Sequence, residues 1–125
     1  MNKLYKKREI VNIKSTVDNQ VYIVRKLPDA KEAANKLAII NQKVLQLIAS
    51  LDVNKEGVDD LQKNYDPSSL SETIDGAKYT SYSVNKGEKI SICIRSKDNV
   101  MIDDNTILFV VIHELAHVMT EEVGH

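Results

Sequence analysis

Residues 105–125 read NTILFVVIHELAHVMTEEVGH, and all three histidines of the chain fall within this stretch. The six residues before His113 are all apolar, which predicts a helix that is buried on nearly every face. In a helix, residues four apart lie about 40° apart on one side, so His113 and His117 should face the same way. Glu114 should lie about 100° round the helix from His113. A buried helix needs partners for three ionisable side chains, and a metal ion is a suitable one.

This H-E-x-x-H spacing suits one divalent metal ion. Two neutral imidazoles one turn apart can bind a single zinc, and the carboxylate between them can take a proton from water. His125 is 12 residues beyond His113 and directly follows Gly124, a residue type suited to ending a helix and turning the chain back. The alternative is a core helix with two hydrogen-bonded histidines and a surface glutamate. The metal site is preferred because it accounts for all three residues together.

The run FVVIHELAHVMTEEVGH resembles the active-site helix of the zincin metallopeptidases. It is most similar to the small WLM and SprT-like proteases, which include enzymes that cleave DNA-bound proteins, and to related metallopeptidases of giant DNA viruses. The resemblance implies zinc as the cofactor, His113, His117 and His125 as its ligands, and Glu114 as the general base. Metzincins place the third histidine two residues earlier than His125. The motif covers only the last fifth of the chain.

The resemblance therefore implies a zinc-dependent endopeptidase that acts on a peptide or protein substrate. Two other functions stay open, a non-catalytic zinc-stabilised binding module and a protease directed at DNA-bound proteins. The second is suggested by the family and by a basic cluster within residues 1–8, which we expect to form a flexible tail. Zincins normally continue past the third ligand, so the resemblance also implies a C-terminal part that is absent here.

The length predicts one domain over residues 1–125, and the expected mixture of helices and strands gives it the α+β class. The net charge of −1 provides no overall attraction to nucleic acid or to an anionic membrane. The chain has one cysteine, Cys93, so it cannot form an internal disulfide. We find no signal-peptide core and no apolar run long enough to span a membrane, so we expect an intracellular protein without a membrane partner, in the cytoplasm or within a virus or its host cell. The sequence leaves the oligomeric state open.

Upstream of the motif, alternating and β-branched residues predict a first hairpin from residues 9–15 and 20–26. A long amphipathic helix should follow through Leu51, with Asp29 as its N-cap and Glu32 completing a capping box. A short helix is predicted over residues 56–64.

The later part of the chain shows one clearer hairpin, formed by residues 79–84 and 88–94. Residues 70–76 are expected to be a loop that leads into it, and Asp104 or Asn105 should cap the motif helix. The predicted fold is a minimal zincin-like domain, with a small, mostly antiparallel sheet packed on a long N-terminal helix and a buried active-site helix. The second hairpin is the predicted substrate-binding edge, because an extended peptide can add to a sheet edge as a further strand.

Overall fold

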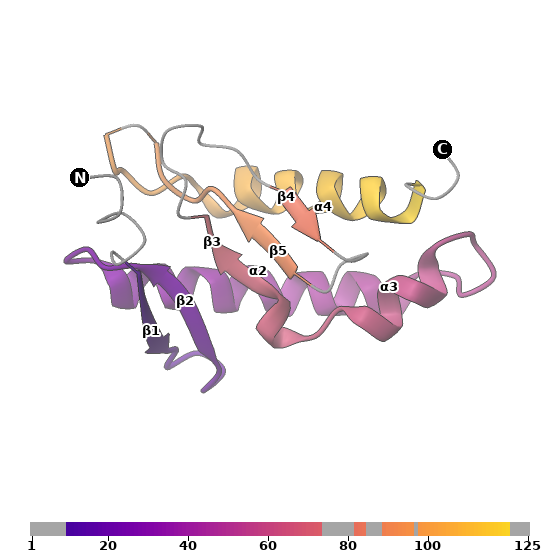
Figure 1. The fold of residues 1–125 in the computed structure, drawn as a ribbon, viewed down its shortest axis with the longest axis horizontal. Helices are drawn as coiled ribbons and strands as arrows, with labels where there is room; N and C mark the ends of the chain where they lie inside the picture. The colour runs from indigo at the N-terminus through magenta and orange to yellow at the C-terminus, as the bar shows by residue number, and fades with distance from the viewer. Residues whose placement is uncertain (1–9, 74–81, 85–88, 97, 121–125) are drawn as a thin grey trace.

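The computed structural model describes residues 10–73, 82–84, 89–96 and 98–120 (Figure 1). Helices and small sheets are mixed along the chain, which confirms the predicted α+β class. The elements of these ranges are β1 (Ile10–Lys14), β2 (Val21–Arg25), α2 (Ala30–Ser50), α3 (Val58–Asn64), the 3₁₀ helix η1 (Pro67–Ser69), β3 (Leu70–Glu72), β4 (Tyr82–Val84), β5 (Lys89–Ile92) and α4 (Asp104–Thr120). The predicted N-terminal tail lies outside the described residues.

The first hairpin is confirmed, with β1 and β2 antiparallel and Ile10 opposite Arg25. Side chains alternate between the faces of a strand, so β2 can bury one face and expose the other. Tyr22 and Val24 are buried, whereas Ile23 between them is 41% exposed. Contacts of β2 with α2 show that the buried face packs on the long helix.

The second sheet has the strand order β3-β5-β4. The predicted hairpin is confirmed where the structure describes it, because β4 and β5 are antiparallel with Val84 opposite Lys89. The loop predicted over residues 70–76 is wrong at its start, since Leu70–Glu72 forms β3 and pairs in parallel with β5. A three-residue strand has little pattern of its own, and its partner lies 20 residues further along the chain.

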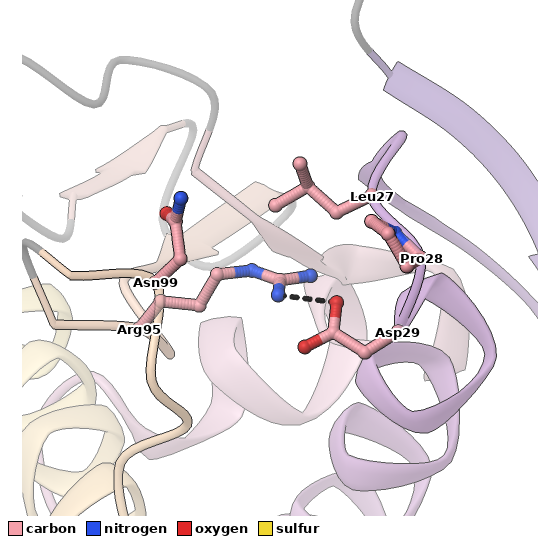
Figure 2. A pocket seen from close by; sticks show the side chains of 5 residues that line it. All are labelled: Leu27, Pro28, Asp29, Arg95 and Asn99. Atoms are coloured by element: carbon pink, nitrogen blue, oxygen red, sulfur yellow. Dashed lines mark hydrogen bonds and ion pairs between the residues drawn. The ribbon is translucent and has the colours of Figure 1, made fainter.

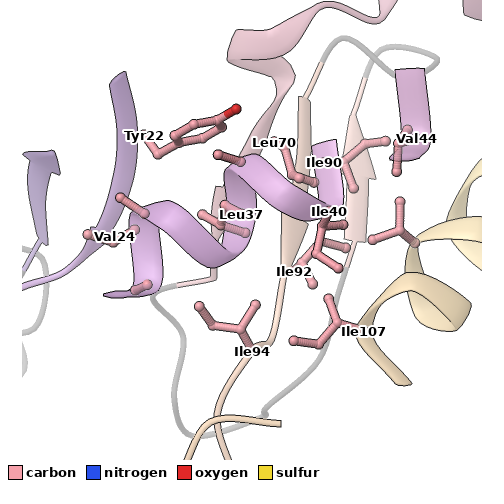
Figure 3. Packing of buried hydrophobic residues seen from close by; sticks show 14 of the residues in the cluster. Tyr22, Val24, Leu37, Ile40, Val44, Leu70, Ile90, Ile92, Ile94 and Ile107 are labelled. Atoms are coloured by element: carbon pink, nitrogen blue, oxygen red, sulfur yellow. The ribbon is translucent and has the colours of Figure 1, made fainter. Parts of the chain in front are cut away.

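The core lies between α2, the two sheets and α4 (Figure 3). The apolar stripe predicted for α2 is its buried face, which includes Leu37, Ile40 and Val44. Ile90 and Ile92 of β5 and the following Ile94 are also buried, while Cys93 is half-buried. Residues two apart on a strand share a face, which explains why the isoleucines enter the core together.

The start of α2 corrects the predicted capping box. Asp29 is the N-cap residue, but its side chain makes no capping hydrogen bond. Its carboxylate instead accepts a hydrogen bond of 2.5 Å from Nη1 of Arg95, beside a surface pocket of about 240 Å³ (Figure 2). Arg95 also donates from Nε to Glu72 at 2.6 Å, and both side chains are 2% exposed. Burial by itself disfavours the charged guanidinium, but the hydrogen bonds to these two carboxylates outweigh it and raise the pKa of Arg95.

The expectation that α4 is buried on nearly every face is wrong. Ile107, Val111 and Leu115 form one buried line, whereas Phe109 is 72% exposed and Ile112 is 40% exposed. An unbroken apolar run carries no periodicity, so it cannot reveal that the helix packs on one side only. Within the described ranges, no helix combines the length and apolar character required to cross a membrane.

The predicted cap of α4 also shifts by one residue. Asp103, and neither Asp104 nor Asn105, caps the helix, because its carboxylate accepts hydrogen bonds from the Thr106 backbone N–H at 3.0 Å and from its hydroxyl at 2.8 Å. These bonds to Thr106 lower the pKa of Asp103. The Asp104 side chain is engaged elsewhere, with Lys36.

Candidate metal centre

His113 and His117 lie together on α4, as their spacing predicts. Their Nε2 atoms are 3.1 Å apart, and their ring centroids are 4.6 Å apart with the ring planes at 89°. Both residues are exposed. The two nitrogens therefore lie within hydrogen-bonding distance of each other, on a side of α4 that is accessible from outside the protein.

This separation fits a shared zinc ion. Zinc binds histidine nitrogen at about 2.0–2.1 Å in a tetrahedral arrangement, which places two such nitrogens about 3.3 Å apart. The 3.1 Å between the Nε2 atoms is within a few tenths of an ångström of that value. The backbone of a single helix holds the two rings at this spacing, so small side-chain rotations would suffice to bind the ion.

Glu114 follows His113 directly on α4 and is half-buried. Helical geometry places it about 100° round from His113, between the buried line of the helix and its exposed histidines. A carboxylate in this position lies beside the two rings and not between them. It can accept a proton from a water molecule there without itself being a ligand.

The third predicted ligand, His125, lies outside the described residues. Within the parts of the chain that the structure describes, no group of three or more histidine, cysteine, aspartate or glutamate side chains could hold a metal ion. The structure thus brings together two of the three predicted ligands, and the assignment of His125 stays a prediction.

Two contacts, one near each end of α4, fix its position. At the beginning of the helix, Asp104 pairs with Lys36 of α2 at 2.5 Å. At the end, Gly57 before α3 packs against Met119, so closely that a Cβ atom on Gly57 would lie 2.7 Å from the Cα of Met119. Gly57 has a φ of +84°, a conformation that glycine adopts without strain. The sequence indicates neither contact, because each joins segments that are far apart along the chain.

The second sheet lies beside α4. In the described part of this sheet, β4 is an outer strand, paired on one side with β5. Both β4 and β5 contact α4 (Figure 1). The backbone of an outer strand and the histidine pair therefore belong to neighbouring elements.

Comparison with known proteins finds relatives among viruses. The chain is 35% identical over 127 residues to an uncharacterized protein of Acanthamoeba polyphaga mimivirus, in an alignment that covers 95% of this chain and 64% of that protein. Shorter alignments match uncharacterized proteins of Invertebrate iridescent virus 3 (46% over 46 residues) and Invertebrate iridescent virus 6 (42% over 48 residues). Each covers 36% of this chain, and 28% and 26% of the respective viral proteins.

The chain thus spans less than two thirds of the length of each of these relatives. No protein-family model matches the sequence. No solved structure is significantly similar to it. The names of these relatives state no activity, so function is inferred from the geometry of the site.

Proposed function

We propose that the chain is a zinc-dependent endopeptidase of the zincin type, in which His113 and His117 hold the metal and Glu114 is the general base. The 3.1 Å separation of the two Nε2 atoms is the observation that carries this proposal. We assign His125 as the third ligand on the resemblance of the sequence alone.

Each residue of the proposed site has its own role in peptide hydrolysis. Zinc at such a site lowers the pKa of water toward neutrality and polarises a carbonyl group. His113 and His117 fix the position of the reaction on the exposed side of α4. Glu114 takes a proton from the attacking water and delivers it to the leaving amine. One carboxylate, held in place by the helix backbone, thus deprotonates the water and protonates the leaving amine.

The substrate in this proposal is an extended polypeptide that pairs with β4. An outer strand offers backbone groups that can bind a peptide whatever its side chains are, and β4 contacts the helix that bears the histidines. Both observations support the prediction that the second hairpin supplies the substrate-binding edge.

A zinc-stabilised binding module is the second candidate. Structural zinc sites are closed by four protein ligands, whereas catalytic sites leave one position open to water. Both histidines are exposed, which favours an open site. Glu114, beside the two rings, also favours a catalytic site, because a structural zinc site has no use for a general base there.

The test compares the unmutated chain with Glu114→Gln, using zinc content and cleavage of an unstructured protein such as casein. We expect the variant to retain zinc and to lose at least about a hundredfold in turnover, because general-base catalysis contributes about 10²–10⁴-fold. The control is Gln42→Glu, which exchanges a carboxamide and a carboxylate on the exposed side of α2. It should leave zinc content and casein cleavage unchanged. Equal turnover by Glu114→Gln and the unmutated chain would contradict the proposed role.

A further inference from the structure

Among the residues of α4 whose exposure the structure describes, the exposed ones include no carboxylate, ammonium or guanidinium group. Within the described part of the helix, its exposed residues are Asn105, Thr106, Phe109, Ile112, His113, Ala116 and His117. The exposed residues of α2, by contrast, include Lys31, Glu32 and Lys43. Solvated helix faces are normally charged, and depletion of charge is typical of the centre of a binding surface.

The apolar part of this face adjoins the histidines. Phe109 precedes His113 by one helical turn, and the side chain is 72% exposed. Ile112 lies immediately before His113 and is 40% exposed. Around the helix axis, Ala116 lies between Phe109 and Ile112. A single exposed apolar side chain needs no explanation, but a cluster beside two converging imidazoles indicates a binding site.

We infer that Phe109 and Ile112 form a subsite for a large apolar side chain of the polypeptide substrate. This inference rests on the proposed function, which places the substrate carbonyl at His113 and His117. Four residues of helix advance about 6 Å, and an extended chain advances about 3.3 Å per residue. A side chain one or two residues from that carbonyl therefore reaches Phe109. In the described part of this face, the lack of carboxylate, ammonium and guanidinium groups around Phe109 and Ile112 favours apolar over acidic or basic side chains.

The occupant is thus an extended polypeptide and not a second copy of this chain. Both histidines are exposed on the same face, so a self-association surface here would cover the candidate metal centre. A substrate segment uses the apolar residues and the histidines together.

The binding test uses the 125-residue chain carrying Glu114→Gln, with zinc added, so that a bound peptide is not consumed. Two fluorescently labelled decapeptides of glycine and serine are compared, one with two central leucines and one with serines in their place. We expect the leucine peptide to bind about tenfold more tightly, since burying one large apolar side chain contributes at least this factor. Adding Phe109→Ser or Ile112→Ser should remove most of the difference. Val100→Ser, which changes a 62% exposed apolar residue outside α4, should leave the preference intact.

Zinc content and circular dichroism of each variant verify that the metal centre and the fold persist. Equal affinity for the two peptides, or a preference that survives both α4 substitutions, would overturn the inference. A dimer that dissociates in Phe109→Ser would also overturn it, because a second copy would then be the occupant. The leucine preference could depend on Phe109 while the chain with Glu114 intact cleaves no peptide. That result would support the subsite and refute the peptidase proposal.

Discussion

Asp29 accepts a 2.5 Å hydrogen bond from Arg95, although the two residues are 66 positions apart in the sequence. The same guanidinium binds Glu72, whose carboxylate also accepts a hydrogen bond from the backbone N–H of Arg25 at 2.8 Å. Arg95 therefore joins the start of α2 to β2 and β3, and it directly precedes the loop that leads to α4. Arg95 is thus a buried cation with two carboxylate partners from separate elements.

Replacement of Arg95 should be strongly destabilising. Arg95→Met leaves the carboxylate of Glu72 buried without its cation, and breaking a buried ion pair in this way costs about 3–5 kcal/mol. The loss is measured as the change in the free energy of unfolding by urea denaturation. The double variant Arg95→Met/Glu72→Gln should recover a large part of it, because no unpaired buried charge remains at Glu72. A double variant that is no more stable than Arg95→Met alone would show that charge pairing is not the cause.

Gly57 should not tolerate a side chain. Gly57→Ala combines a left-handed backbone with a Cβ atom 2.7 Å from the Cα of Met119, so α3 or the end of α4 must move. We expect a loss of about 1–3 kcal/mol in the free energy of unfolding. The control Lys55→Ala, two residues earlier and exposed, should change it by less than about 0.5 kcal/mol. Similar stability of the two variants would contradict the close approach of Gly57 to α4.

The cap at Asp103 should make stability depend on pH in the acidic range. The pKa of Asp103 is lowered in the folded chain by its bonds to Thr106, so the contribution is present above the unfolded pKa of about 3.9 and is lost as the pH falls through the folded pKa. Asp103→Ala should lower the Tm at pH 6, and the difference from the unmutated chain should shrink below pH 4. Asn105→Ala, on an exposed residue nearby, serves as the control. A Tm difference that is the same at pH 6 and pH 3 would argue against the charged cap.

The sequence predicts those features that depend on local patterns. The period of α2 identifies its buried face, and the alternation around Ile90 identifies β5, because burial on one side imposes a repeat on a single segment. The spacing of His113 and His117 likewise fixes their proximity, since both belong to one helix.

Features that depend on distant partners escape such reasoning. Asp29 has the sequence context of a helix cap, but the competing cation is supplied by Arg95, far along the chain. The strand at residues 70–72 exists because β5 lies beside it. The exposure of Phe109 follows from which elements cover α4, and its apolar neighbours give no sign of this. Local patterns therefore predict the elements and the histidine pair, whereas contacts between elements determine the exposed surface around them.

Zinc binding at neutral pH is the direct test of the metal centre on α4. We predict one zinc per unmutated chain, measured by elemental analysis after dialysis, with affinity determined by competition against a chelating dye. His113→Ala and His117→Ala should each weaken binding by at least about a hundredfold, because each removes one of the converging nitrogens. His125→Ala should also weaken it, and Asn105→Ala on the same exposed face should not. An unmutated chain that binds no zinc, or histidine variants that bind it as tightly as the unmutated chain, would rule out a zinc site at His113 and His117.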